Sequence, residues 1–267
     1  MNNNKLIFLK LGGSLITDKS HPLTPHLEII QRISVEIAQI RKNNPHLKLV
    51  LGHGSGSFGH SVANLHQTQK GVQGKASWQG FAEVWAAARD LNQIIIQHLT
   101  ARGLPVIAFP PSAGIIAENH TVRSWDIAPL KAALSHNLIP VVQGDVIFDK
   151  TIGGTIFSTE NIFQFLAEIL HPRRILLAGL DPGVYRQPSQ SHEIIDSIST
   201  ENIEHILPAL SGAGSPDVTG GMASKVRSMF ELVQSNPSLE VLIFSGMQPG
   251  NIEKAIRGEN LGTLITK

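Results

Sequence analysis

The stretch Leu47–His60 reads LKLVLGHGSGSFGH, an apolar run that passes directly into a glycine-rich loop. The apolar part predicts a buried β-strand. The glycines allow backbone N–H groups to approach an anion closely, because glycine has no side chain and tolerates positive φ. His60 ends the loop and can donate a hydrogen bond to a phosphate. The stretch therefore predicts a strand with a phosphate site at its carboxyl end.

The rest of the chain alternates strand and helix signals. Further runs rich in Val, Ile and Leu predict buried strands at Leu6–Leu11, Pro105–Phe109, Ile139–Gln143, Ile175–Ala178, Val241–Phe244 and Leu264–Thr266. Apolar residues at three- and four-residue spacing predict helices over Leu27–Ile40, Phe81–Leu99, Ile127–Ser135 (capped by Asp126) and Met222–Val233. This alternation predicts an α/β fold with a largely parallel central sheet and helices on both faces, a three-layer αβα sandwich.

The length of 267 residues, with 42% hydrophobic residues, suits one large domain over 1–267. We expect two lobes that share the sheet, 1–165 and 166–267, with a division near residues 160–172. The segment 182–200 contains many Ser and Gln residues and predicts a long loop. The segment 211–221 predicts a second glycine-rich loop.

Charge and composition exclude several classes of function. The formal net charge of +1 provides no global field for nucleic acid or an anionic membrane. The chain has no cysteine, which excludes disulfides, thiolate metal sites and a Cys nucleophile. Because the lack of disulfides fits a reducing compartment, we expect a cytoplasmic location. No apolar stretch reaches the ~18 residues of a membrane helix, and no signal peptide is recognised, so we expect no membrane partner. No acidic residue occurs between Glu36 and Glu83, so this basic region is either a solvated face or the surroundings of an anion site.

The glycine loop also matches a dinucleotide-binding fingerprint, Gly54-x-Gly56-x-x-Gly59. Such a site needs an acidic residue about 20 residues further on to hold the ribose. The first acidic residue after the loop is Glu83. We therefore give this match little weight.

The strand Leu6–Leu11 passes into a second glycine segment, Gly12-Gly13-Ser14, with Lys10 and Lys19 on either side. Glycine N–H groups at this position can cradle a polyphosphate while the lysines supply charge. The segment is not a Walker loop, because Asp18 stands in place of the required glycine and we expect no helix to follow at once. The alternative is a tight turn with two surface lysines.

Three further segments place glycines or charges at the ends of elements. Gly144-Asp145 follows a strand, where a carboxylate faces the ligand crevice of an α/β sheet, although a simple turn is the alternative. Residues 217–225, DVTGGMASK, predict a helix N-terminus with Lys225 in its early turns. A capped surface helix is the alternative, which the two glycines disfavour. Residues 179–185, GLDPGVY, predict a turn that could flank a nucleotide.

Together, the glycine loops and three lysines favour phosphoryl transfer, which needs positioning and charge neutralisation more than a covalent nucleophile. In order and spacing, the motifs from Lys10 to Lys225 resemble the amino acid kinase superfamily. The segments HGSGSFGH (53–60) and DVTGGM (217–222) make the chain similar, within that superfamily, to the isopentenyl phosphate kinase family.

This resemblance implies ATP-dependent phosphorylation of isopentenyl phosphate by in-line transfer, with Mg²⁺, in a homodimer. It implies an acceptor-binding lobe 1–165 and a nucleotide-binding lobe 166–267. The implied catalytic residues are Lys10, Lys19, His60, Asp145 and Lys225. The implied nucleotide site comprises Lys10, Gly12, Gly13, Ser14, Gly56, Asp181, Tyr185, Gly220, Gly221 and Lys225, with Gly12 and Gly13 donating N–H bonds. The implied acceptor site comprises Ser55, Gly56, Gly59, His60 and Gly144, and no residue is assigned to a metal.

Three residues depart from the pattern of the family. Ser55 stands where the family usually has glycine. Glu160, in Ser158-Thr159-Glu160, stands where the family commonly has aspartate. Leu180 stands where the family often has aspartate, with Asp181 next to it.

Phe81, Val84 and Trp85 could form the wall of a pocket for the isopentenyl tail or belong to the ordinary core. Two alternative functions stay open at this point. One is a related kinase for another small phosphate, phosphonate or carboxylate acceptor. The other is a non-catalytic nucleotide-binding regulator.

Overall fold

The computed structural model describes residues 6–186, 193–211 and 221–267, apart from the side chains of His60 and Ser211. The strand β1 (Leu6–Leu11) lies at the centre of the fold. Its residues are all buried, as expected of a strand covered on both faces. β1 pairs in parallel with β2 (Lys48–His53) on one side and with β9 (Arg174–Gly179) on the other.

β1 belongs to an eight-stranded sheet in the order β10-β12-β11-β9-β1-β2-β6-β3. The other strands of this sheet are β3 (Val106–Ala108), β6 (Ile139–Gln143), β10 (Ser197–Ile198), β11 (Glu240–Ser245) and β12 (Thr263–Ile265). All neighbours are parallel except β11 and β12. Every strand predicted from the sequence lies in this sheet, so the prediction of a largely parallel sheet is confirmed.

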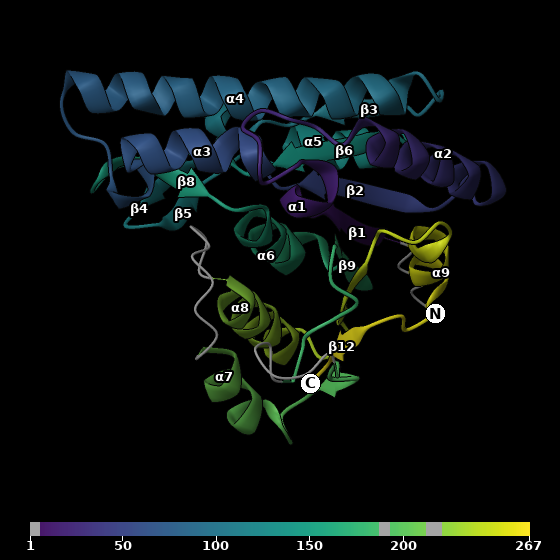
Figure 1. Cartoon of the computed structure of the whole chain (residues 1–267). Helices are drawn as coiled ribbons and strands as arrows, with labels where there is room; N and C mark the ends of the chain where they lie inside the picture. Colours follow the sequence, from purple (N-terminus) through teal and green to yellow (C-terminus); the bar gives the residue numbers. More distant parts are fainter. Residues whose placement is uncertain (1–5, 187–192, 212–220) are drawn as a thin grey trace.

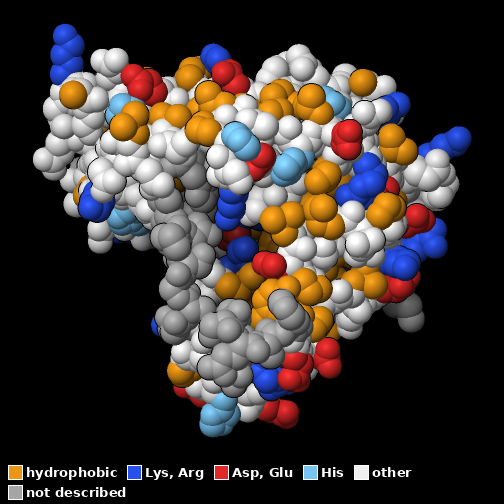
Figure 2. Space-filling model, viewed as in Figure 1, with side chains coloured by type: hydrophobic (Ala, Val, Ile, Leu, Met, Phe, Trp, Pro, Cys, Tyr) orange, Lys and Arg blue, Asp and Glu red, His pale blue; other side chains and the backbone are white. Residues whose placement is uncertain are grey.

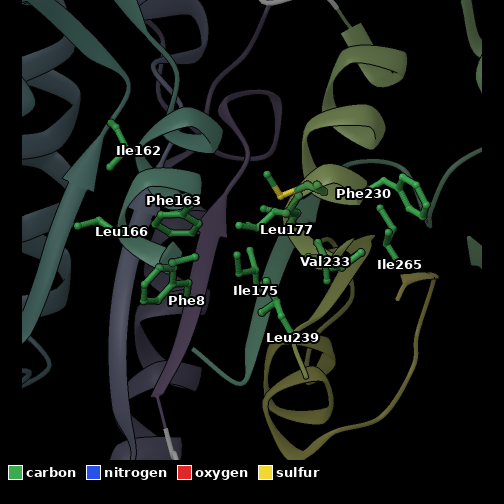
Figure 3. Close-up of a cluster of buried hydrophobic side chains, with 14 of the residues drawn as sticks. Phe8, Ile162, Phe163, Leu166, Ile175, Leu177, Phe230, Val233, Leu239 and Ile265 are labelled. Atoms are coloured by element: carbon green, nitrogen blue, oxygen red, sulfur yellow. The ribbon is translucent and has the colours of Figure 1, made fainter. Parts of the chain in front are cut away.

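Helices cover both faces of the sheet (Figure 1). On one face, Ile7 and Leu9 of β1 share a core with α2 (Leu27–Asn43), α4 (Lys75–Thr100) and α9 (Asn251–Arg257). On the other, Leu6 and Phe8 share a core with α5 (Ala128–Ser135), α6 (Thr159–Leu170), α7 (Ile203–Ser211) and α8 (Gly221–Ser235). The rings of Phe8 and Phe163 lie 5.0 Å apart in this second core (Figure 3). The three-layer αβα sandwich is thereby confirmed.

A second, four-stranded sheet was not predicted. Its order is β5-β4-β7-β8, and its strands are β4 (Ile116–Glu118), β5 (Thr121–Ser124), β7 (Asp145–Asp149) and β8 (Gly153–Phe157). β7 and β8 form an antiparallel hairpin directly after Gly144. The sequence signal is weak because β4 and β5 are short and β8 begins with two glycines, which strands disfavour.

Two short helices correct the expected loops. α3 (Gly56–His66) begins inside the predicted glycine loop, so only Gly54 and Ser55 join β2 to the helix. A single helical turn, α1 (Gly13–Ile16), begins directly after Gly12, whereas no helix follows Asp18 and Lys19 until α2 begins at Leu27, as expected. In both places glycine permits a close or left-handed backbone, and Gly56 has φ +50°. β1 and β2 are therefore each followed by a helix after only one or two residues.

The remaining segments are short. Thr68–Lys70 and Pro111–Ala113 form 3₁₀ turns. Within the predicted loop 182–200, Tyr185 pairs with Ile194 in an antiparallel bridge. Most of the predicted glycine loop 211–221 lies outside the described residues. Among the residues that the structure describes, no helix is long and apolar enough to cross a membrane.

Candidate active site

A cavity of about 260 Å³ lies at the carboxyl ends of the central strands. This is the edge at which open α/β sheets bind ligands, because neighbouring parallel strands end there together. The lining comes from the ends of β1, β2, β6 and β9 and from α3, α4, α6 and α8. Figure 2 shows basic and acidic side chains together in a hollow on this face of the molecule.

The turns after β1 and β2 touch each other backbone to backbone. A Cβ on Gly13 would lie 2.5 Å from the Gly56 nitrogen, and a Cβ on Gly54 would lie 2.9 Å from the Gly13 nitrogen. The side chain of Thr17 bridges the two turns by hydrogen bonds. Its Oγ1 donates to the Gly13 carbonyl (2.8 Å) and accepts from the Ser57 N–H (2.9 Å). The glycines are therefore required by close packing between the two turns.

Several backbone N–H groups in these turns have no hydrogen-bond partner among the described residues: those of Gly13, Ser14, Ser55 and Gly56. All four residues line the cavity. The N–H of Gly12 differs, because it donates to the Ala178 carbonyl at 2.7 Å. The expected N–H bond from Gly12 to a phosphate is therefore not available in this arrangement.

Glu160, in the first turn of α6, holds two of the predicted lysines together. Its carboxylate forms an ion pair with Lys10 at the end of β1, and its Oε1 lies 3.8 Å from Lys225 Nζ on α8. Burial by itself would raise the pKa of Glu160, but the charges of Lys10 and Lys225 outweigh burial and lower the pKa to about 2. The site thus contains an ionised carboxylate that faces two ammonium groups.

Asp145 follows Gly144 and is 2% exposed. Burial raises the pKa of Asp145 to about 6, although hydrogen bonds from Ser112 and the Val146 N–H act against this rise. The Ser112 hydroxyl donates to Oδ2 at 2.7 Å. The sequence could not reveal Ser112, because it lies 33 residues away from Asp145 on a different element.

The structure brings most of the predicted site residues together. Those that line the cavity are Lys10, Gly12, Gly13, Ser14, Lys19, Ser55, Gly56, Gly59, Gly144, Asp145, Asp181 and Lys225. Gly221 begins α8 and Tyr185 lies in its bridge with Ile194, and neither belongs to the lining. Gly220 and the side chain of His60 lie outside the described residues.

One part of the cavity is apolar. Val84 lines it, together with Ala63, Ala88 and Ile156. Of the other two suggested wall residues, Phe81 packs against Trp78 and Phe148, which also contact each other, and Trp85 lies beneath the guanidinium of Arg89. The four-residue spacing of Val84 and Ala88 could have identified Ala88, whereas Ile156 belongs to the unpredicted β8.

The carboxylates of the cavity do not form a protein-built metal site. Asp145, Glu160 and Asp181 line it, but the described residues contain no group of three or more His, Cys, Asp or Glu that could hold a metal ion. Mg²⁺ commonly binds through one or two carboxylates plus substrate phosphates. The donor set therefore fits a Mg²⁺ ion that is held mainly by a nucleotide.

Comparison with known proteins agrees with this geometry. The sequence profile of the amino acid kinase family matches residues 5–245. The isopentenyl phosphate kinase of Methanocaldococcus jannaschii is 35% identical and covers 97% of this chain and 98% of its own length. The isopentenyl phosphate kinase of Methanothermobacter thermautotrophicus is 31% identical and covers 98% and 99%, respectively.

A solved structure of isopentenyl phosphate kinase superposes with a TM-score of 0.81 at 30% identity and covers 98% of this chain and 100% of its own. The similarity thus extends over nearly the whole chain. The chain belongs to the amino acid kinase family and, within it, to the isopentenyl phosphate kinases.

Proposed function

We propose that the protein transfers the γ-phosphoryl group of ATP to isopentenyl phosphate and forms isopentenyl diphosphate. The convergence of Lys10 and Lys225 on Glu160 carries this proposal, because it places two cations inside a cavity lined by glycine turns. The relatives that match nearly the whole chain carry the name of this activity.

The chemistry needs little from the protein besides charge and position. The acceptor is a phosphate that is largely ionised at neutral pH, so its oxygen can attack without a strong general base. Lys10 and Lys225 neutralise the charge that spreads over the transferring group. The N–H groups of Gly13 and Ser14 add neutral donors beside Lys10, and the exposed Lys19 adds a cation to the lining.

The apolar part of the cavity supports an acceptor with a hydrocarbon tail. Ala63, Val84 and Ile156 pack in one hydrophobic cluster, next to the turn of Ser55 and Gly56. Full burial of a five-carbon tail contributes about 4 kcal/mol at ~0.8 kcal/mol per carbon. A charged amino-acid acceptor would gain no such contribution and would lose hydration there.

We assign acceptor binding to the lobe 1–165 and nucleotide binding to the lobe 166–267. Ser55, Gly59 and Gly144 face the cavity from the first lobe, whereas Asp181 and Lys225 face it from the second. Mg²⁺, when bound, neutralises charge on the β and γ phosphates. Asp181 is the exposed carboxylate of the lining and suits a partial set of ligands, because Glu160 is already paired with two lysines.

The proposal is tested by ADP release with isopentenyl phosphate and a panel of small phosphates, phosphonates and carboxylates. We expect turnover with isopentenyl phosphate that depends on Mg²⁺. Turnover with another acceptor alone would show a related kinase of different specificity. ATP binding without turnover on any acceptor would show a regulator. The homodimer expected for the family is tested separately by light scattering after size exclusion.

A further inference from the structure

His53, the last residue of β2, connects three segments of the cavity wall through its backbone and its side chain. Its carbonyl accepts from the Gly144 N–H (3.1 Å) and from the Thr159 hydroxyl (2.6 Å). Gly144 precedes Asp145, and Thr159 precedes Glu160. The side chain of His53 is 1% exposed and faces two further groups, the Gly54 carbonyl and Asn92. The proposed mechanism does not use this imidazole.

The contact with Gly54 determines where one ring proton sits. Nδ1 of His53 lies 3.1 Å from the Gly54 carbonyl oxygen. A carbonyl oxygen only accepts hydrogen bonds, so Nδ1 must carry the proton. The Gly54 carbonyl and the Ser55 N–H belong to one planar trans peptide group and point in opposite directions. By holding this carbonyl, His53 directs the Ser55 N–H away from itself, and Ser55 is one of the residues that line the cavity.

The second ring nitrogen is held by α4. Nε2 of His53 lies 3.0 Å from the side-chain oxygen Oδ1 of Asn92, and Asn92 is itself buried. Burial lowers the pKa of His53, and the charge of Lys10 lowers it further, although both hydrogen bonds oppose this shift. The ring is therefore neutral, with an unprotonated Nε2 that accepts. A half-turn of the Asn92 amide presents Nδ2 as the matching donor.

We propose that His53 is a positioning residue for the acceptor phosphate, acting as an Nδ1-protonated imidazole that fixes the peptide between Gly54 and Ser55. Asn92 holds the ring in place from the opposite side. The Ser55 N–H, which has no hydrogen-bond partner among the described residues, is thereby directed at the phosphate of the acceptor. The inference relies on the proposed function only for the identity of that acceptor.

Two substitutions separate the two ring nitrogens. His53→Asn places an amide N–H near the position of Nδ1, so it keeps a donor for the Gly54 carbonyl and loses the contact with Asn92. His53→Gln places its amide near Nε2, so it keeps the contact with Asn92 and loses the donor. Both variants retain a polar, uncharged group of smaller volume at the same buried position. Urea unfolding of both variants measures the stability change that they share.

We expect His53→Gln to raise the KM for isopentenyl phosphate about tenfold, the scale of one lost hydrogen bond near the upper end of its usual range. The KM for ATP should stay within about twofold of the wild-type value, because Lys10 and Lys225 are untouched. His53→Asn should keep the acceptor KM within about threefold. Equal effects of the two variants, or equal losses for ATP and acceptor, would overturn the proposal.

The ring proton is tested without any variant. The ¹⁵N NMR signals of the wild-type His53 ring should show a protonated Nδ1 and an unprotonated Nε2 around neutral pH. Protonation of both nitrogens, or of Nε2 alone, would overturn the assignment. Inorganic phosphate serves as a second probe, and its Kd should follow the same order among the variants. If wild-type enzyme binds phosphate but does not phosphorylate isopentenyl phosphate, the proposed function fails while the His53 inference is still tested.

Discussion

Glu160 pairs with Lys10 inside the cavity and so connects the first turn of α6 to the end of β1. The same carboxylate also faces Lys225, so one anion contacts two cations that come from different elements, β1 and α8. Lys10 and Lys225 both lie close to this carboxylate, and without its negative charge the two ammonium groups would repel each other. The ion pair therefore determines whether the cationic side of the site can assemble.

Replacing Glu160 with Gln should lower kcat about 100-fold, because Lys10 loses the group that fixes its position. Glu160→Asp keeps the charge and should lose much less. Steady-state ADP release with saturating ATP and isopentenyl phosphate measures both variants. A kcat for Glu160→Gln within about threefold of that of Glu160→Asp would show that the charge does not position the lysines.

Glu160 also predicts how stability depends on pH. Because its pKa falls from 4.5 to about 2 on folding, its contribution is present above pH 4.5 and is lost as the pH falls toward 2. At neutral pH, Glu160→Gln should lower the free energy of unfolding by about 3 kcal/mol. Urea unfolding at neutral and acidic pH measures this difference, which should shrink in acid. A difference that stays constant with pH would contradict this account.

The raised pKa of Asp145 predicts the opposite dependence of stability on pH. Its pKa rises from 3.8 to about 6 on folding, so the folded state binds more protons and the wild type loses stability as the pH rises through this window. The shift corresponds to about 3 kcal/mol. Asp145→Asn should lack this loss and should be more stable than wild type at neutral pH, while its kcat should fall. Urea unfolding across this pH range, together with ADP release, measures both effects.

Asp149, at the other end of β7, is the matched control for this experiment. It accepts backbone N–H bonds from Asn119, His120, Thr151 and Ile152, and these bonds outweigh burial and lower the pKa of Asp149. Asp149→Asn should therefore destabilise the protein at neutral pH. The same sign of change in both variants would contradict the assigned shifts.

Gly13→Ala should destabilise the protein and reduce turnover, because its Cβ would lie 2.5 Å from the Gly56 nitrogen and force the two turns apart. Gly144→Ala is the control, since its Cβ would meet the Thr159 hydroxyl at an ordinary 3.5 Å. We expect Gly144→Ala to fold with near wild-type stability and to raise mainly the acceptor KM. Thermal unfolding and steady-state kinetics measure both. Similar melting temperatures for the two variants would argue against close packing of the turns.

His60→Ala should weaken acceptor binding more than ATP binding, as expected if its ring donates to the acceptor phosphate. Loss of a hydrogen bond to a charged group costs about 1.5–3 kcal/mol. Calorimetric titration with isopentenyl phosphate and with a non-hydrolysable ATP analogue measures the two affinities. An equal loss for both ligands would contradict this role.

Much of the fold could be predicted because the central strands are continuous apolar runs, as in β1 and β6. Glycine and lysine at strand ends also indicated most of the cavity, since parallel strands bring such residues to one edge. The four-stranded sheet escaped prediction because its strands are short and β8 begins with glycines. α6 was not among the predicted helices, although its sequence carries two signals of a helix. Ser158 is a typical N-cap and accepts from the Asn161 N–H, and Ile162 and Leu166 have helical spacing.

The contacts that complete the site could not be predicted, because they join residues that are distant in the sequence. Ser112 reaches Asp145 from a 3₁₀ turn, and Asn92 reaches His53 from the middle of α4. Neither residue has a neighbouring motif that marks it. Likewise, Thr17 is an ordinary residue in sequence, and only the fold places its hydroxyl between Gly13 and Ser57.

The backbone contact between Gly13 and Gly56 has a consequence for how such an enzyme can change its substrate. If the two turns hold the donor and acceptor phosphates as proposed, their contact fixes the separation between these phosphates by main-chain geometry. The apolar end is built from side chains on α3, α4 and β8, which can vary without moving that wall. Substitutions at positions such as Val84 and Ile156 can therefore change which length and shape of acceptor tail fits the cavity. The distance between the donor and acceptor phosphates stays the same.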